Sequence, residues 1–209
     1  FPMMGKTSFE TVKTEKDILD LFQSQFPDSI KLMPNLVEEF QNNPIGDLAS
    51  VYCKPWHWED KALLIGDAAH AVVPFFGQGM NASFQDCSTL AKLMGQNEND
   101  WKTIFNAFSS VQVENGHAIA DMALENYMEM RDHVNDPEYK KRRDMELKLE
   151  RMFPGQFIPR YSMVSFHQIP YAEVYKRGGK QFKIISDVLK ADPSGQSIDK
   201  AMVEKLFPE

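Results

Sequence analysis

The sequence predicts an α+β fold that is mainly helical. Three stretches, at residues 80–94, 101–133 and 137–152, place apolar side chains at the spacing of amphipathic helices. Two short apolar runs, at residues 48–53 and 62–65, are instead typical of strands. We therefore expect helices to predominate, with a small strand component between them.

The N-terminal part of the chain predicts two short helices. Apolar residues recur at helical spacing over residues 18–26 and again over residues 36–40. Residues that start or stop helices flank both stretches, namely Thr14 and Pro27 for the first helix and Pro34 and Asn43-Pro44 for the second. These flanking residues set the approximate bounds of both helices.

The two predicted strands differ in how far they should be buried. Residues 48–53 alternate between apolar and polar side chains, which is typical of a half-buried strand. Ala62-Leu63-Leu64-Ile65 is continuously apolar, as expected for a strand that is buried on both faces, and it stops at Gly66-Asp67. A carboxylate at the end of such a strand is well placed to bind a ligand.

The helix that begins near Met80 is expected to end at Gly95, because glycine is common just after the last helical residue. The stripe that it should bury consists of Phe84, Cys87, Ala91 and Met94. A long helix is expected from about Trp101 to His133, with a bend near Gly116. The helix over residues 137–152 should bury Met145, Leu149 and Met152.

The C-terminal part is less regular in sequence. Residues 176–183 include Gly178-Gly179 and predict a loop before a final helix over residues 182–190. The tail beyond Ala191 is expected to be partly disordered.

Composition and charge exclude several classes of protein. With 209 residues, 43% of them hydrophobic and 25% charged, the chain has the composition of a soluble globular protein. Its net charge of −7 argues against nucleic acid as a partner. Two cysteines form neither a disulfide scaffold nor a metal-binding spacing, and the sequence holds no apolar run of the roughly 20 residues that a transmembrane helix needs. We expect no metal site and no transmembrane segment.

The most informative segment is residues 66–81. It opens with Gly66-Asp67, bends at Pro74, and continues as Gly77-Gln78-Gly79-Met80-Asn81. Glycines let a flat ring approach the backbone, and the helix that starts near Gly79 directs unpaired N–H groups toward the same place. Taken alone, Gly66-Asp67 is more often a turn with a capping carboxylate than a ligand site.

The complete segment resembles the second flavin-binding motif of the single-component FAD-dependent aromatic hydroxylases, and we call residues 66–81 the flavin motif. Residues 73–81, 126–131 and 157–164 are similar to segments of the kynurenine 3-monooxygenase family in particular. The resemblance covers roughly residues 48–170, and it is weak in the first forty residues and absent from the last thirty. The G-x-G-x-x-G loop that binds the FAD pyrophosphate does not occur in the sequence. The resemblance therefore implies the C-terminal half of an α/β FAD-dependent aromatic hydroxylase.

The same resemblance implies that the chain consists of three parts. Residues 1–55 would end the substrate-domain sheet and its helices, residues 56–98 would complete the FAD-binding domain, and residues 99–209 would form a C-terminal helical domain.

The resemblance also assigns site residues. Those expected to bind the cofactor are Asp67, Pro74, Gly77, Gln78, Gly79, Met80 and Asn81. Those expected to bind the substrate are Asn126, Tyr161, Phe75 and Met130. Asn126 also interrupts an apolar helical stripe, where a buried amide needs a partner. No residue of this chain is expected to be catalytic, and His70 is expected to be structural.

The implied reaction is the hydroxylation of L-kynurenine to 3-hydroxykynurenine with FAD, NADPH and O₂. The implied partner is the N-terminal half of the same protein, and without it the chain should be inactive. The polar C-terminal region predicts a bacterial-type cytoplasmic enzyme rather than a membrane-anchored one. Two alternatives stay open: a flavin hydroxylase of another aromatic substrate, and a non-catalytic helical interaction module.

Overall fold

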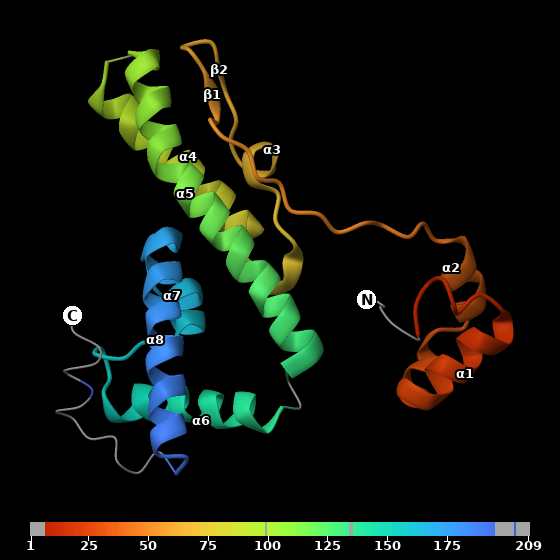
Figure 1. The fold of residues 1–209 in the computed structure, drawn as a ribbon. Coiled ribbons are helices and arrows are strands. Elements are labelled where there is room, and N and C mark those ends of the chain that lie inside the picture. The colour runs from red at the N-terminus through yellow and green to blue at the C-terminus, as the bar shows by residue number, and fades with distance from the viewer. Residues whose placement is uncertain (1–6, 99, 134–135, 195–202, 204–209) are drawn as a thin grey trace. The chain divides into compact units, whose positions relative to one another are not determined.

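The computed structural model describes residues 7–98, 100–133, 136–194 and 203 (Figure 1). The chain divides into two compact units, Phe1–Asp47 and Leu48–Glu209, each of which has its own apolar core. Helices make up most of the described residues, which confirms the predicted mainly helical fold. The three-part division predicted from the sequence stays a prediction.

The first unit consists of α1 (Glu15–Gln25), a 3₁₀ helix η1 (Pro27–Leu32) and α2 (Leu36–Asn42). Thr14 caps α1, because its side chain accepts a hydrogen bond from the Asp17 N–H while the Asp17 carboxylate accepts one from the Thr14 N–H. The buried side chains of this unit are Val12, Ile18, Phe22 and Leu36. Both predicted N-terminal helices are therefore confirmed.

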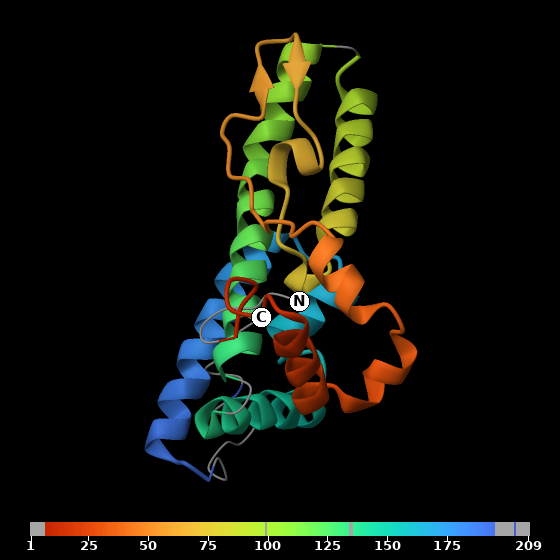
Figure 2. The ribbon, with the colours of Figure 1, turned by 90° about the vertical axis from the view of Figure 1, so that its right-hand side faces the viewer.

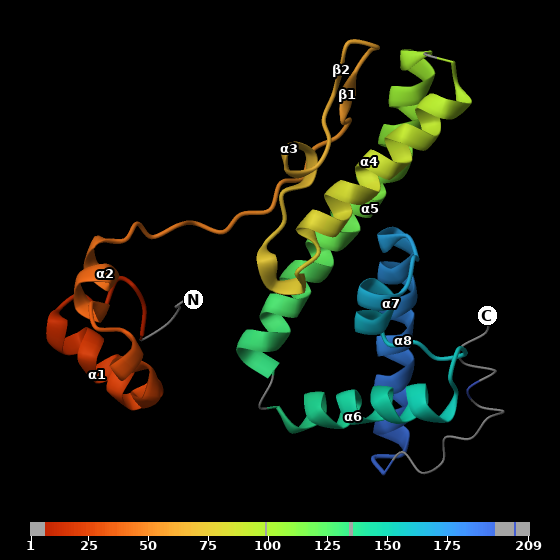
Figure 3. The ribbon, with the colours of Figure 1, turned by 180° about the vertical axis from the view of Figure 1, so that it is seen from behind.

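The second unit begins with a short antiparallel hairpin of β1 (His57–Trp58) and β2 (Ala62–Leu63). Its helical elements, in chain order, are α3 (Asp67–His70), the 3₁₀ turn η2 (Pro74–Phe76), α4 (Gly79–Gln96), α5 (Trp101–Met128), the π-helical turn η3 (Glu129–His133), α6 (Pro137–Met152), α7 (Arg160–Phe166) and α8 (Tyr171–Ala191). Figures 1 and 3 show α4 and α5 side by side, with α6 crossing near one end of α8.

The hairpin and α3 lie along the α4–α5 pair (Figure 2), where Trp56 is fully buried. Gly116 of α5 permits this packing. A Cβ atom at Gly116 would stand 2.6 Å from Cη2 of Trp56, which is closer than carbon atoms approach. Helix α5 continues through Gly116 without a break, and this glycine leaves room for the Trp56 ring. The predicted bend stays a prediction.

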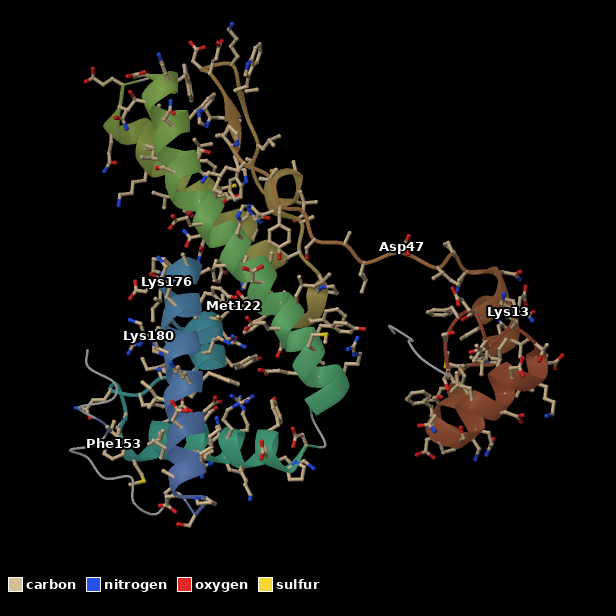
Figure 4. The ribbon with its side chains drawn as sticks, in the orientation of Figure 1. Lys13, Asp47, Met122, Phe153, Lys176 and Lys180 are labelled. Atoms are coloured by element: carbon tan, nitrogen blue, oxygen red, sulfur yellow. The ribbon has the colours of Figure 1, made fainter. Side chains whose placement is uncertain are left out.

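Besides the cluster of Trp56, Ala69, Phe108 and Val113, two apolar clusters hold the described helices of the second unit together. The first joins α4, α5, α7 and α8 and consists of Ala82, Ala118, Ile119, Met122, Met163, Val164, Tyr171 and Val174, with Met122 labelled in Figure 4. The second joins α6 to α8 and consists of Met145, Leu149, Phe153, Phe157, Ile185, Val188 and Val203. Burial of Met145 and Leu149 is thus confirmed, whereas Met152 is 49% exposed.

Both strand predictions need correction. Residues 48–53 form no strand, and only Ala62–Leu63 of the second run is paired, with an exposed Ala62 and with Leu64 and Ile65 41% and 37% exposed. A strand is buried on both faces only where elements cover it. Within the described residues, β2 pairs with β1 alone.

Two helix predictions also need correction. Phe84 of α4 is 62% exposed and Cys87 is exposed, because α4 instead turns Ala82 and Asp86 toward its neighbours. Gly178-Gly179 lies within the continuous helix α8, where Gly178 packs against the side chain of Arg160. The tail from residue 195 onward, apart from Val203, falls outside the described residues.

Of the helices described, none is both long and apolar enough to cross a membrane.

Candidate functional site

The flavin motif starts where β2 leads into α3. Gly66 has φ +59°, a left-handed value that glycine adopts without strain, and Asp67 is the first residue of the helix. The Asp67 carboxylate is exposed and makes no hydrogen bond or ion pair with the described residues. The capping alternative is therefore not supported, since a capping carboxylate would accept a hydrogen bond from a nearby backbone N–H.

The second half of the motif brings the backbone to the N-terminus of α4. Pro74 opens η2, and Gly77 follows with φ +68°. Apart from its two chain neighbours, no described residue has an atom within 4 Å of the place where a Cβ of Gly77 would stand. No side chain among the described residues caps α4, so its first N–H groups remain free for an acceptor. Met80, in the first turn, is 69% exposed.

Gln78 is the exception among the predicted cofactor residues. It is buried, and its Oε1 accepts hydrogen bonds from Asn81 Nδ2 at 3.0 Å and from the Tyr171 hydroxyl at 3.1 Å. Burial holds the pKa of the Tyr171 phenol above its usual value, so this donor keeps its proton. The Gln78 Oε1 atom thus links the start of α4 to α8.

These features fit a bound flavin. The open space beside Gly77 and the uncapped start of α4 suit a flat ring with negative charge at one edge. The unpartnered carboxylate of Asp67 suits a hydroxyl-bearing chain, because an ionised carboxylate only accepts hydrogen bonds. Exposed Met80 and Phe84 supply apolar surface nearby.

The expected structural role of His70 agrees with its surroundings. His70 is 1% exposed, stacks on Trp56 with ring centroids 5.0 Å apart, and has its Nε2 2.7 Å from Oδ2 of Asp86. Such a ring has no access to a substrate.

A pocket of about 100 Å³ lies where the end of α5 meets α6, α7 and α8. Asn126 and Tyr161, both predicted to bind substrate, line it, together with Phe76 of the flavin motif. The rings of Phe76 and Tyr161 stack with their centroids 5.7 Å apart. The structure thus brings residues 35 positions apart in the chain, Asn126 and Tyr161, to one place beside the flavin motif.

The other two predicted substrate residues lie outside the lining of this pocket. Phe75 stacks on Tyr127 with ring centroids 4.5 Å apart, and its backbone oxygen accepts a hydrogen bond from Asn126 Nδ2 at 2.7 Å. Met130 is 56% exposed, and its sulfur lies 3.8 Å from the same nitrogen. Both residues therefore contact the Asn126 amide or its neighbour rather than the pocket itself.

Charged side chains that the sequence reasoning missed form one wall of the pocket. Arg160 pairs with Glu125 and also lies 3.6 Å from Oε1 of Glu129, which Arg142 approaches at the same distance. Glu125 accepts a further hydrogen bond from Tyr175, whose pKa is raised first by burial and then by this bond. The four-residue spacing of the two glutamates on one helix, followed by an arginine next to Tyr161, was the available signal.

Comparison with known families identifies the class of protein. Residues 14–103 match the family described as FAD binding domain, and this span contains the whole flavin motif. The match confirms the predicted flavoprotein class and FAD as the cofactor of that class.

Comparison with curated relatives identifies the particular proteins that the chain resembles. It is 43% identical over 206 residues to kynurenine 3-monooxygenase of Myxococcus xanthus, an alignment that covers 99% of this chain and 44% of the relative. It is 42% identical over 189 residues to the protein of that name from Cytophaga hutchinsonii, covering 90% of this chain and 42% of the relative. It is 40% identical over 205 residues to the protein of that name from Xanthomonas euvesicatoria, and this alignment covers 98% of this chain and 45% of the relative.

The predicted resemblance to kynurenine 3-monooxygenases is therefore confirmed. Its predicted extent was too short, because the alignments cover 90–99% of this chain. The chain spans less than half the length of these relatives.

Proposed function

We propose that the chain is part of an FAD-dependent monooxygenase that hydroxylates L-kynurenine to 3-hydroxykynurenine with NADPH and O₂. The observation that carries the proposal is the position of Asn126 and Tyr161. Both line one pocket, and Tyr161 stacks on Phe76, which belongs to the flavin motif. A substrate held by these two residues would lie next to the cofactor.

The hydrogen bonds of Asn126 favour one way of holding the substrate. Its Nδ2 already donates to the Phe75 carbonyl at 2.7 Å, while its Oδ1 has no partner among the described residues. The free atom is thus an acceptor, which suits an ammonium group. The hydroxyl of Tyr161 has no partner in the described part of the chain either, and a phenol can donate to a carboxylate. Together the two residues suit the two ends of an amino-acid group.

FAD, when bound, would supply the reduction and oxygen-transfer chemistry. The residues of this chain would hold it through Asp67 and through the backbone N–H groups at the start of α4. Stacked Phe75–Tyr127 and Phe76–Tyr161 pairs give apolar surface beside the motif. Such surface keeps water from the reacting atoms and orients an aromatic ring.

We also propose that the activity needs the remainder of a longer protein. The relatives are more than twice as long as their aligned parts, and this sequence lacks the G-x-G-x-x-G loop that binds a pyrophosphate. The N-terminal half of the same protein would supply that loop. The position of the loop in that half stays a prediction that sequencing would check. The cytoplasmic location predicted from the sequence also stays a prediction, which cell fractionation would check.

The decisive experiment is a product assay on the complete flavoprotein that contains this chain. Kynurenine, NADPH and O₂ should yield 3-hydroxykynurenine, identified by mass spectrometry. Parallel reactions with phenol and 4-hydroxybenzoate test the alternative of another aromatic substrate. A protein that binds FAD but hydroxylates one of these in place of kynurenine would keep the class and overturn the substrate. A protein that binds neither FAD nor kynurenine would favour the interaction module.

A further inference from the structure

A chain of buried polar groups, centred on Asp86 of α4, holds the start of the flavin motif. Asp86 is 2% exposed, and its carboxylate meets groups of three residues from two other segments, α3 with its N-cap and α5. The Gly66 N–H donates to Oδ2 at 2.8 Å, Gln112 Nε2 donates to Oδ1 at 2.8 Å, and His70 Nε2 lies 2.7 Å from Oδ2. A carboxylate buried to this extent is tolerated only with such partners.

The chain continues from Gln112 to the first turn of α8. Asn115 Nδ2 donates to Gln112 Oε1 at 2.9 Å, and Asn115 Oδ1 accepts from the Ala172 N–H at 3.1 Å. Each amide in this series has its orientation fixed by its neighbour, because donor and acceptor ends must match. The carboxylate of Asp86 is therefore held from both sides.

The peptide that this chain fixes is the one that presents Asp67. Gly66 directly precedes Asp67, has a left-handed backbone, and would bring a Cβ to 3.2 Å from Ser83 Oγ. The Asp67 side chain has no supporting hydrogen bond from any described residue. Its direction therefore follows from the backbone of Gly66, and that backbone is anchored by Asp86.

We propose that Asp86 is a positioning residue for the cofactor: through the Gly66 N–H it fixes the turn from which Asp67 contacts FAD. Asp86 is buried and does not itself reach the ligand. The proposal rests on the proposed function, because it requires FAD to bind at Asp67. If Asp86 only stabilised the fold, its effect on FAD affinity would not depend on Asp67. As a positioning residue, Asp86 affects FAD affinity through Asp67.

A double-mutant cycle on the complete flavoprotein tests this role. The FAD dissociation constant is measured for Asp67→Ala, Asp86→Asn and the double variant. We expect each single change to raise the FAD dissociation constant about ten-fold, which is about 1.4 kcal/mol. The double variant should have the same FAD dissociation constant as Asp67→Ala alone. Once the Asp67 carboxylate is absent, there is nothing left for Asp86 to position.

The outcomes separate the two proposals. If both single changes weaken FAD binding but the double variant is about a hundred-fold weaker, the effects add and Asp86 is only structural. Normal affinity in Asp86→Asn likewise overturns the positioning role. Normal affinity in Asp67→Ala overturns the FAD contact of the proposed function itself, and the positioning role with it.

A second variant and a control guard against misfolding. Gln112→Met keeps the size of the side chain but removes the donor to Asp86, so it should show the same non-additivity with Asp67→Ala, at smaller amplitude. Ser109→Ala is the matched control. Ser109 is a buried α5 residue that bonds the Trp56 N–H at 3.1 Å and lies outside the polar chain. It should lower the melting temperature while leaving the FAD dissociation constant unchanged.

Discussion

At the scale of single residues, the Asn126 amide has two different environments. One end is committed to the Phe75 carbonyl, and the other end is free at a pocket. Asn126 Nδ2 donates to the flavin motif, and Asn126 Oδ1 can accept from a ligand. An aspartate cannot replace Asn126 in both of these contacts. Both oxygens of an aspartate would be acceptors, and one would then face the carbonyl of Phe75.

Changes at the two predicted substrate residues should act on substrate affinity. In the complete flavoprotein, Asn126→Ala and Tyr161→Phe should each raise the KM for kynurenine, by roughly ten-fold for each 1.4 kcal/mol of lost contact, with normal FAD content. Steady-state kinetics and the flavin absorbance measure both. As control, Tyr52→Phe removes a hydroxyl that bonds Asp121 away from the pocket, and its KM should stay unchanged. Wild-type KM in both variants, together with lower thermal stability, would make Asn126 and Tyr161 core polar groups.

The sequence predicted some residues of this site and not others. Asn126 and Tyr161 could be found because they lie in motifs that resemble a known family, and because an amide within an apolar stripe is unusual. Arg160 lies in the same family-like segment as Tyr161, but its partners could not be predicted in this way. Its ion pairs with Glu125 and Glu129 join α7 to α5, and no local pattern shows which distant helix an arginine will meet. The roles of all these residues stay predictions.

At the scale of elements, the crossing of α7 and α8 depends on one glycine. A Cβ at Gly178 would stand 2.6 Å from Cδ of Arg160, whereas a Cβ at Gly179 would meet nothing within 4 Å. Gly178→Ala should therefore lower the free energy of unfolding by about 1–3 kcal/mol through overpacking. Gly179→Ala should raise it by roughly 0.5–1 kcal/mol, since alanine is the better helix former. Urea denaturation of the two variants gives both values.

One outcome would contradict the prediction for Gly178→Ala. If the two alanine variants unfold at the same urea concentration, the close contact with Arg160 is not a constraint on α8. Circular dichroism should show the same helix content in both, because both glycines lie inside the helix.

Local signals predicted the ends of α1 well, but not the end of α4 or the start of α8. Thr14 and Pro27 bound α1 because a cap and a helix stop act on adjacent backbone groups. The buried face of α4 could not be predicted in this way. Apolar Phe84 is exposed and ionisable Asp86 is buried, because the Gly66 N–H and Gln112, far away in the sequence, supply the partners of that carboxylate.

At the scale of the whole molecule, the 209-residue chain alone should bind FAD weakly or not at all, and should not hydroxylate kynurenine. The flavin motif offers Asp67 and the start of α4, but no pyrophosphate loop occurs in the sequence. Fluorescence titration of FAD against the purified chain and against the complete protein measures the difference. A chain that purifies with one equivalent of yellow cofactor would refute this expectation.

Stability at high pH should depend on buried tyrosines. Burial raises the pKa of Tyr171 above the ordinary value of 10.0, and burial together with hydrogen bonds to carboxylates does the same for Tyr52 and Tyr175. A pKa raised by folding adds stability that is complete below the unfolded value and is lost as pH rises through the folded value. The free energy of unfolding should thus decline above pH 10, and less steeply in Tyr171→Phe. Identical slopes in both proteins would exclude Tyr171 from this effect.

Because Trp56 packs against Gly116, the substitutions that each of these two positions tolerates depend on the residue at the other. The indole occupies the space that any Cβ at position 116 would need, so α5 and the segment before β1 are constrained as a pair. A larger residue at position 116 becomes acceptable only after position 56 has become smaller, and the reverse order creates a void. In a saturation library, the tolerance of position 116 should therefore depend on the residue at position 56, a pairwise epistasis that neither position reveals alone.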